Sequence, residues 1–510
     1  GMLTILPLIF YAFFTGFSPS TQRALIMITV LLLSFISERE TDVVSSLCIA
    51  GILILLLDAA ALFTISFQLS FMAVAFIISG LFLMRPLKLT SRRSWGSRIT
   101  MTVLVTVFAS LGTAPLTAHY FYITSGVGVI SNLLFIPLIG FVVLPTGLMA
   151  MVLFHIFPGL SVILLEVCCH LLELSILICG KLVESPFSHY RVAGLDSLTT
   201  GGIYLVCSTG FFLFRKKIKT AMVSGMIALG CLVIPAVQSH VLHQDFPGAE
   251  ITILDVGQGS SAVITTASNH HILVDGGGFG GLSQFDTGRF LVGPFLWHKG
   301  IRHLDYVILT HPENDHLRGL IFILENFSVG RLIKNQDIAS TRAYQQLMAV
   351  CQKKSIPVWH PDLQNNTIDL GEITLTFFDT QYPLESGNLN DNSLVFKLRH
   401  KEVAMLFAGD ILNTREARLS RSDRIDLDSD ILVAPHHGSR TSSTKVFLDQ
   451  TSPESVVISC GWNNRYGFPH RTILQRYHDN GMRIFRTDRD GAVVISSNGR
   501  GYTIETIRDG

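Results

Sequence analysis

The sequence has few charged residues, since only 15% of its 510 residues are Asp, Glu, Lys or Arg while 48% are hydrophobic. Long apolar runs fill residues 1–244, and residues 245–510 have the composition of an ordinary globular domain. The formal net charge of +1 conceals this division, with 13 basic and 8 acidic residues before residue 245 but 26 and 30 from there on. The composition excludes a chain that is soluble throughout, and the acidic second half excludes a generic polyanion binder.

The Cys-x-x-Cys motif of thiolate metal sites and the phosphate-binding loop of nucleotide-binding proteins are also missing. No Cys-x-x-Cys occurs, and six of the eight cysteines lie in apolar runs, where cysteine behaves as a small hydrophobe. Neither a thiolate zinc site nor a disulfide framework is therefore expected. There is no Gly-x-x-x-x-Gly-Lys-Ser/Thr stretch, so any transport must draw its energy from elsewhere. The chain opens directly on an apolar run without a cleavage signal, and we interpret it as a fragment that begins inside a membrane domain.

The first half predicts a polytopic α-helical membrane domain over residues 1–240. About 20 apolar residues cross a bilayer, and the runs that approach this length are 2–17, 22–37, 43–57, 68–84, 99–118, 126–156, 159–182, 198–214 and 219–238. Pro137 and Pro145 indicate a broken helix or an interfacial piece in the run 126–156. Basic residues crowd two loops, 85–98 and 215–219, which the positive-inside rule assigns to the cytoplasm. One further span then places residues 245–510 on the extracytoplasmic side.

Glu166, His170 and Glu173 lie within one apolar run at spacings that put all three on one helical face. Ionisable groups at membrane depth are costly and should face protein or a water-filled path. The three side chains therefore either line a membrane path or form a structural polar layer between helices.

In the second half, four apolar strands each lead into His or Asp at the carboxyl end. Strand 305–309 leads into the loop 310–316, strand 403–408 into Gly409-Asp410, strand 431–434 into His436-His437, and strand 455–459 toward His470. Imidazole and carboxylate groups suit Zn²⁺, Mn²⁺ or Fe²⁺. The loop 310–316 alone could be a capped helix start with an incidental histidine, but the four strand ends together predict a metal site.

The remaining pattern predicts an α/β domain over residues 245–510. Further strands are expected at 249–255, 261–265, 271–275, 372–378, 394–399 and 492–496, and helices at 316–327, 341–354, 443–450 and 470–480. Two sheets with helices outside, an αββα sandwich, is the natural packing.

These motifs carry a resemblance to known families. Asp275, the loop 311–316, Gly409-Asp410 and His470 resemble the metallo-β-lactamase fold. The stretches 254–259, 435–439 and 466–470 resemble the C-terminal domain of ComEC-type DNA-internalisation proteins of natural competence, and the membrane half is similar to that family's competence domain. The resemblance covers nearly the whole chain and lacks the family's N-terminal OB-like domain and first membrane helices.

The resemblance implies metal-assisted phosphodiester hydrolysis. The implied metal ligands are His311, Glu313, Asp315, His316, Asp410 and His470. Asp315, His436 and His437 are the implied catalytic residues, and Asp255 and Asp275 would support the ligands from behind. Glu313 stands where the superfamily usually has histidine, so one metal position is poor in nitrogen. This favours a harder ion such as Mn²⁺ for at least one position, or a single metal, over a tight di-zinc site. The expected cofactor is therefore Mn²⁺ or Zn²⁺, as one or two ions.

The implied substrate is single-stranded DNA, with one strand degraded and the other conducted across a bacterial inner membrane during natural transformation. The implied partners are membrane lipid, a DNA receptor and a cytoplasmic translocation motor, and self-association into a homo-oligomer is compatible with this picture. Arg465, Arg471 and Arg476 belong to an arginine-rich stretch that could track a DNA backbone. The same stretch is also compatible with a solvated helix face whose arginines form ion pairs.

Two other functions remain open from the sequence. One is a DNA channel whose hydrolase-like domain is inactive and only structural. The other is a membrane-tethered metallohydrolase of small esters or lactones.

Overall fold

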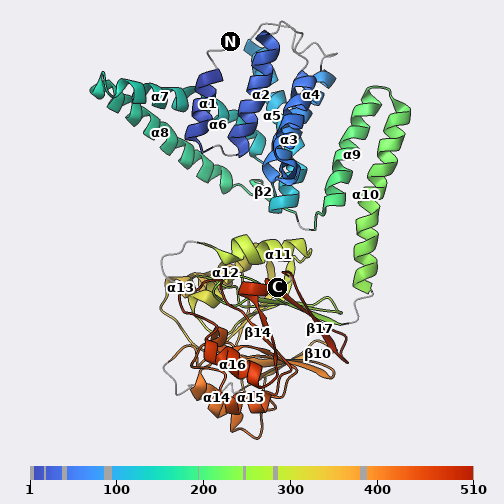
Figure 1. Ribbon diagram of the computed structural model, residues 1–510, viewed down its shortest axis with the longest axis vertical. Coiled ribbons are helices and arrows are strands. Elements are labelled where there is room, and N and C mark those ends of the chain that lie inside the picture. The colour runs from blue at the N-terminus through green and yellow to red at the C-terminus, as the bar shows by residue number, and fades with distance from the viewer. Residues whose placement is uncertain are drawn as a thin grey trace. The chain divides into compact units, whose positions relative to one another are not determined.

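The computed structural model describes residues 5–16, 19–36, 43–84, 95–192, 194–244, 248–279, 285–378 and 388–508. The chain divides into two compact units, Gly1–Ala236 and Val237–Gly510, which are described separately below (Figure 1). Most of the predicted basic loop 85–98 lies outside the described residues.

The first unit is helical. Its helices are α1 (Ile5–Phe14), α2 (Pro19–Ile36), α3 (Val43–Leu57), α4 (Ile65–Met84), α5 (Trp95–Phe121), α6 (Gly128–Pro137), α7 (Leu144–Leu153), α8 (Pro158–Val183), α9 (Ser197–Phe214) and α10 (Ile218–Gln244), the last of which runs into the second unit. A short two-stranded antiparallel sheet pairs β1 (Ile123–Ser125) with β2 (His189–Arg191), which are far apart in the sequence. Among the described residues, six helical segments are long and apolar enough to cross a membrane. They confirm the predicted polytopic helical fold.

Two of the expected spans, 2–17 and 43–57, are represented by shorter helices among the described residues. The described helix α1 has only 10 residues, and the apolar part of α3, Val44–Leu57, is shorter than a bilayer-crossing helix.

The run 126–156 does not break at its prolines. It stays helical from α6 to α7 through a π-helical turn, Leu138–Val143, directly after Pro137. Residues 59–63 form a 3₁₀ turn capped by Asp58.

Small residues set the closest helix contacts in this unit. A Cβ on Gly80 of α4 would lie 2.3 Å from the ring of Phe108 on α5, and a Cβ on Gly112 would lie 2.7 Å from the carbonyl of Met72. Without a side chain at these positions the two helices approach closely, which is how membrane helices gain packing energy.

The second unit contains two sheets. Eight strands form the order β17-β16-β3-β4-β5-β6-β7-β8 and seven form the order β15-β14-β13-β12-β11-β10-β9. The first sheet comprises β3 (Ala249–Ile253), β4 (Ala262–Thr266), β5 (His271–Val274), β6 (His303–Leu309), β7 (Ser328–Lys334), β8 (Val358–Trp359), β16 (Val493–Ser497) and β17 (Tyr502–Thr506). The second comprises β9 (Thr367–Asp369), β10 (Ile373–Phe378), β11 (Val395–His400), β12 (Val403–Phe407), β13 (Ile431–Val433), β14 (Ser455–Ile458) and β15 (Arg483–Arg486).

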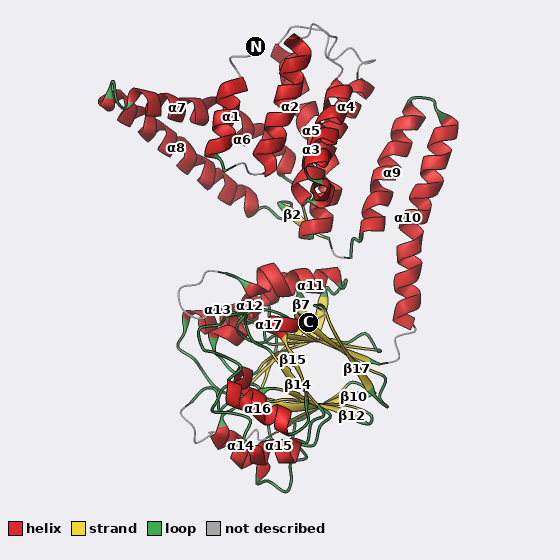
Figure 2. Cartoon of the chain, in the orientation of Figure 1, coloured by secondary structure: helices red, strands yellow, loops and turns green. Residues whose placement is uncertain are grey.

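The sheets pack face to face with helices outside them, as Figure 2 shows. Residues from both sheets, including Ile251, Ile264, Phe377 and Phe407, share one buried core. A second core lies between the seven-stranded sheet and its helices. The helices are α11 (Gly293–His298), α12 (Asn314–Asn326), α13 (Arg342–Lys353), α14 (Asn413–Ser420), α15 (Lys445–Thr451), α16 (Arg471–Asp479) and α17 (Thr487–Asp490). The predicted αββα sandwich is therefore confirmed.

Each sheet has a parallel half that places the carboxyl ends of its strands together. Strands β5, β6, β7 and β8 are mutually parallel, as are β12, β13, β14 and β15. The loops that follow β5, β6, β12, β13 and β14 lead to the polar cluster described next.

Candidate metal centre

Four ionisable side chains converge at this edge of the sandwich. One ligand atom from each of Asp315, His316, Asp410 and His437 lies within 4.8 Å of the other three. Asp315 and His316 begin α12 after strand β6, Asp410 follows β12, and His437 follows β13. The side chains of His316, Asp410 and His437 are at most 5% exposed, so the cluster is shielded from solvent.

His316 is fixed from behind by Asp275, which follows β5. The Asp275 carboxylate accepts from Nδ1 of His316 at 2.7 Å and from the backbone N–H and hydroxyl of Thr310 at 2.9 and 2.8 Å. Nε2 of His316 then faces Asp410 Oδ1 at 3.4 Å. Asp275 thus has the contact of a carboxylate that orients a ligand imidazole. Thr310 was not singled out in the sequence, although it directly precedes the motif histidine.

His437 is oriented by the neighbouring strand. Its Nδ1 lies 2.8 Å from the carbonyl oxygen of Ser459, at the end of β14. Its Nε2 faces Asp410 at 3.4 Å and Asp315 at 3.8 Å. Both His436 and His437 have positive φ, 49° and 54°, a conformation that is costly for residues other than glycine and that clusters at functional sites.

Two glycines permit the close approach of the ligand loops. Gly409 has φ 57°, and a Cβ there would lie 2.7 Å from the side chain of Ser393. The Ser393 hydroxyl accepts the backbone N–H of Asp410 at 3.1 Å. A Cβ on Gly259 would lie 2.2 Å from the carbonyl oxygen of Asp315. Larger residues at either position would push a carboxylate out of the cluster.

The charges in the cluster are mutually dependent. Burial disfavours charge on His437, yet Asp410 and Asp315 raise its pKa to about 10. Burial also disfavours ionisation of Asp315, but the nearby imidazoles of His437 and His316 lower its pKa to about 2. The carboxylates are therefore ionised at neutral pH, and they attract either protons on the imidazoles or a cation.

The side chains fit a divalent metal ion. Nε2 of His316 and Nε2 of His437 are buried and have no hydrogen-bond partner, which is rare for a buried polar atom. Both atoms point to the same carboxylate, and a cavity of about 20 Å³ lies among Asp275, His316, Asp410 and His437. Two imidazoles and two carboxylates form a donor set that suits Zn²⁺ or Mn²⁺. The superfamily fold and this cluster together indicate use of a divalent metal.

Two predicted ligands lie beside the cluster without belonging to the four. The ring of His311 lies 4.2 Å from that of His316, and its buried Nε2 has no hydrogen-bond partner. Burial and the neighbouring His316 lower the pKa of His311 to about 3, which keeps its imidazole neutral. Glu313 is half-buried at the start of α12, where burial and the charge of Asp315 raise its pKa.

His436 and His470 occupy the rim. Nε2 of His436 lies 4.0 Å from Asp410 and 3.5 Å from the side-chain nitrogen of Asn390, and its ring packs on Phe468. The predicted ligand His470 instead caps α16, where its Nδ1 contacts the hydroxyl of Thr472 at 2.8 Å. The structure therefore places His437, rather than His470, in the four-residue cluster.

The other predicted site residues have local partners. Asp255 accepts a long 3.4 Å hydrogen bond from the backbone of Gly257 within its own turn. Arg476 donates to the backbone carbonyl of Ser443. Arg465 is exposed and donates to the hydroxyl of Tyr466 at 2.7 Å. Exposed Arg471 begins α16.

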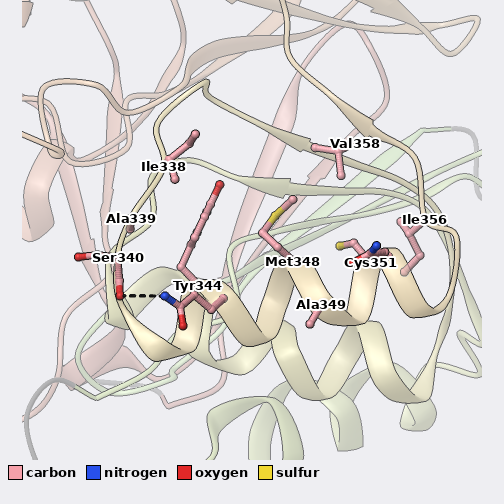
Figure 3. A pocket seen from close by; sticks show the side chains of 11 residues that line it. Ile338, Ala339, Ser340, Tyr344, Met348, Ala349, Cys351, Ile356 and Val358 are labelled. Atoms are coloured by element: carbon pink, nitrogen blue, oxygen red, sulfur yellow. Dashed lines mark hydrogen bonds between the residues drawn. The ribbon is translucent and has the colours of Figure 1, made fainter.

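A wider cavity of about 750 Å³ lies elsewhere, along α13 (Figure 3). Its walls are mainly apolar and include Ile338, Tyr344, Met348 and Val358. The four side chains of the metal cluster do not line it, so we assign no chemistry to this cavity.

Comparisons with known proteins agree with this architecture. Residues 2–217 match the family model described as competence protein, and residues 254–462 match the metallo-β-lactamase superfamily. ComE operon protein 3 of Bacillus subtilis is 25% identical over 511 residues, which cover 96% of this chain and 63% of the relative. Competence protein ComA of Neisseria gonorrhoeae is 27% identical over 512 residues, covering 98% of this chain and 65% of the relative.

The chain is therefore similar to these two competence proteins over nearly all of its own length. It spans less than two thirds of the length of these two relatives. The six helices among the described residues that are long and apolar enough to cross a membrane, together with the competence-protein match, indicate a multi-pass membrane protein. Among solved structures, CmlA, a diiron β-hydroxylase from Streptomyces venezuelae, is 15% identical with a TM-score of 0.34, covering 48% of this chain and 54% of that one.

Proposed function

We propose that this protein acts in DNA uptake during natural transformation and that its second unit is a metal-dependent nuclease for single-stranded DNA. The observation that carries the proposal is the convergence of Asp315, His316, Asp410 and His437 within 4.8 Å. The homology to competence proteins supports DNA as the substrate. The helical unit would conduct one strand, and the second unit, on the extracytoplasmic side, would degrade the other.

Each residue has a distinct role in the proposed hydrolysis. Asp315, His316, Asp410 and His437 would hold the ion, and Asp275 fixes the ring of His316. A divalent ion at this position would lower the pKa of a water molecule and neutralise charge on the phosphate. His436, at the rim, could contact a phosphate oxygen or protonate the leaving oxygen. His311 and Glu313 are the side chains available for a second ion. Mn²⁺ and Zn²⁺ both suit these donors.

A structural role without catalysis is the second candidate. In the region where the superfamily's further histidine ligand is expected, the chain has Asn392 and Ser393. Asn392 donates to Asp337 at 3.1 Å, and Ser393 accepts from the backbone of Asp410. These neutral groups weaken a second metal position, and a DNA channel with an inactive hydrolase-like unit would share this feature. A membrane-tethered hydrolase of small esters or lactones would need the same four ligands but no DNA.

The test is a nuclease assay on the purified full chain with Mn²⁺, Zn²⁺ or EDTA. We expect single-stranded DNA to be cleaved with Mn²⁺ or Zn²⁺ and left intact with EDTA. The matched control is Asp315→Ala, which removes one ligand from the start of α12 and should abolish cleavage. Bound metal without cleavage would favour the inactive unit. Cleavage of esters or lactones but not DNA would favour the small-substrate hydrolase.

The proposed surroundings are a bacterial inner membrane, a DNA receptor and a cytoplasmic motor. The positive-inside assignment of the basic loops supports the extracytoplasmic side for the second unit. A protease-protection assay on sealed cells, with cleavage sites inserted in the exposed loop 362–365, would test this orientation.

A further inference from the structure

A polar groove opens beside the metal centre, between α12 and α13. Its volume is about 410 Å³, and its lining includes Asn314, Arg318, Thr341, Arg342 and Gln346. Arg318 comes four positions after Asn314 in the sequence, so the two residues lie on one face of α12. The groove thus combines two guanidinium groups with amide and hydroxyl side chains.

The groove and the metal centre share the start of α12. Asn314 lines the groove, and the next residue, Asp315, belongs to the metal cluster. The turn that contains Gly257 and Gly259 packs against Phe279 and against the start of α12. A Cβ on Gly257 would lie 2.9 Å from the ring of Phe279, and a Cβ on Gly259 would lie 2.2 Å from the carbonyl oxygen of Asp315. A chain bound in the groove would therefore lie next to the proposed point of cleavage.

Exposed aromatic rings lie at the mouth of the groove. Phe285 lines it and is 42% exposed. Its ring lies 5.7 Å from that of Phe279 and is stacked 5.3 Å from that of Phe290, which is 57% exposed. Partly exposed aromatic rings next to arginines are the combination with which proteins bind single strands, because bases can stack on the rings and phosphates can pair with the cations.

The charges in the groove favour an anion. Arg318 donates through Nη1 to the carbonyl oxygen of Phe279 at 2.9 Å, a bond that fixes the guanidinium while its positive charge remains. Arg342 begins α13 and is exposed. Asp286 is the acid in the lining, and its Oδ1 accepts the backbone N–H of Arg289 at 3.0 Å. Two arginines against one carboxylate leave the lining net positive within a unit that is acidic overall.

We propose that this groove binds the single-stranded DNA segment next to the one being cleaved, with Arg318 and Arg342 on phosphates and Phe285 stacked on a base. The inference rests on the proposed function and deepens it. It places the DNA contact on α12 and α13, away from the stretch of Arg465, Arg471 and Arg476 indicated by the sequence.

The test is a binding assay on the full chain in detergent. A fluorescein-labelled thymidine strand would be titrated by anisotropy with EDTA present, so that no strand is cut, over a series of salt concentrations. Arg318→Ala and Arg342→Ala should each reduce the slope of log affinity against log salt by about 0.7, the value for one single-strand phosphate. Phe285→Ala should lower the affinity about five- to a hundredfold and leave the slope unchanged.

The matched control is Arg302→Ala, an exposed arginine that precedes β6, at the opposite end of this strand from the metal loop. It should leave both affinity and slope unchanged. If the wild-type chain binds the strand but the groove variants behave like the Arg302→Ala control, the groove assignment is wrong and the proposed nuclease stands. If the wild-type chain neither binds nor cleaves single strands, the proposed function fails and the groove proposal fails with it.

Discussion

The two units treat their ionisable residues in opposite ways. In the second unit, the side chains of His316 and Asp410 are 0% and 5% exposed and are held by partners on neighbouring strands. In the first unit, His170 and Glu173 on α8 contact each other at 3.3 Å but are 80% and 73% exposed. Glu166, on the same helix face, is exposed as well. The chain therefore builds a complete polar site in its second unit, whereas the polar face of α8 depends on what surrounds the helix.

The largest difference is expected between His437, which belongs to the metal cluster, and His470, which lies at its rim. We expect His437→Ala to lower Mn²⁺ affinity by more than about a hundredfold, because loss of even an outer partner of a metal ligand typically costs 10–100-fold. His470→Ala should leave the affinity within about twofold and cost about 1 kcal/mol of stability through loss of a helix cap. Calorimetric titration of both variants with Mn²⁺ measures this contrast.

Equal losses in the two variants would show that His470 reaches the ion despite its bond to Thr472. A loss for His470→Ala alone would restore the ligand set indicated by the sequence. Thermal unfolding of the metal-free variants separates the loss of a helix cap from the loss of a ligand.

A smaller loss of metal affinity is expected from changing Asp275, which orients the ligand His316. Asp275→Asn keeps the size of the side chain but removes the charge that Nδ1 of His316 contacts at 2.7 Å. Metal affinity should fall about 10–100-fold. Asp255→Asn is the matched control, since the Asp255 carboxylate bonds only weakly to its own turn, and it should leave affinity unchanged. Comparable losses in both variants would mean that general loss of negative charge, rather than orientation of His316, sets the affinity.

Much of the second unit could be predicted from sequence because buried strands carry a strong signal. Strands β6, β12, β13 and β14 are continuous apolar runs, and each was expected where it occurs. The edge strands β8, β9, β15 and β17 were missed, and so was the interior strand β7, whose first half is largely exposed. Edge strands face solvent on one side and are short or mixed in character, so apolar periodicity does not reveal them.

Within the site, the sequence indicated which loops converge but not which atoms meet. His436 and His437 are adjacent and both have a left-handed backbone, yet His437 belongs to the four-residue cluster while the ring of His436 packs on Phe468 at the rim. His470 follows β14, whose carboxyl end lies beside those of the other ligand-bearing strands, yet its ring caps the N-terminus of α16. Residues that act through the backbone, such as Ser459, leave no motif.

The first unit was predicted less completely because apolar runs there give helices without giving their surroundings. The helical run through Pro137 illustrates this. A break was expected at this proline, but a π-helical turn follows it directly and the chain stays helical. Whether the face of α8 lines a path or meets another helix cannot be decided from apolar periodicity, because both arrangements need the same spacing.

The smallest effect on the isolated protein is therefore expected on α8. The triple change Glu166→Ala, His170→Ala and Glu173→Ala leaves the four residues of the metal cluster in place, so Mn²⁺ affinity should not change. If this face lines the path for DNA, transformation frequency should nevertheless fall, and this would be measured in cells carrying the variant beside the Lys181→Ala control at the end of the same helix. Unchanged transformation together with weakened association of copies in detergent would instead show that the polar face packs against another helix.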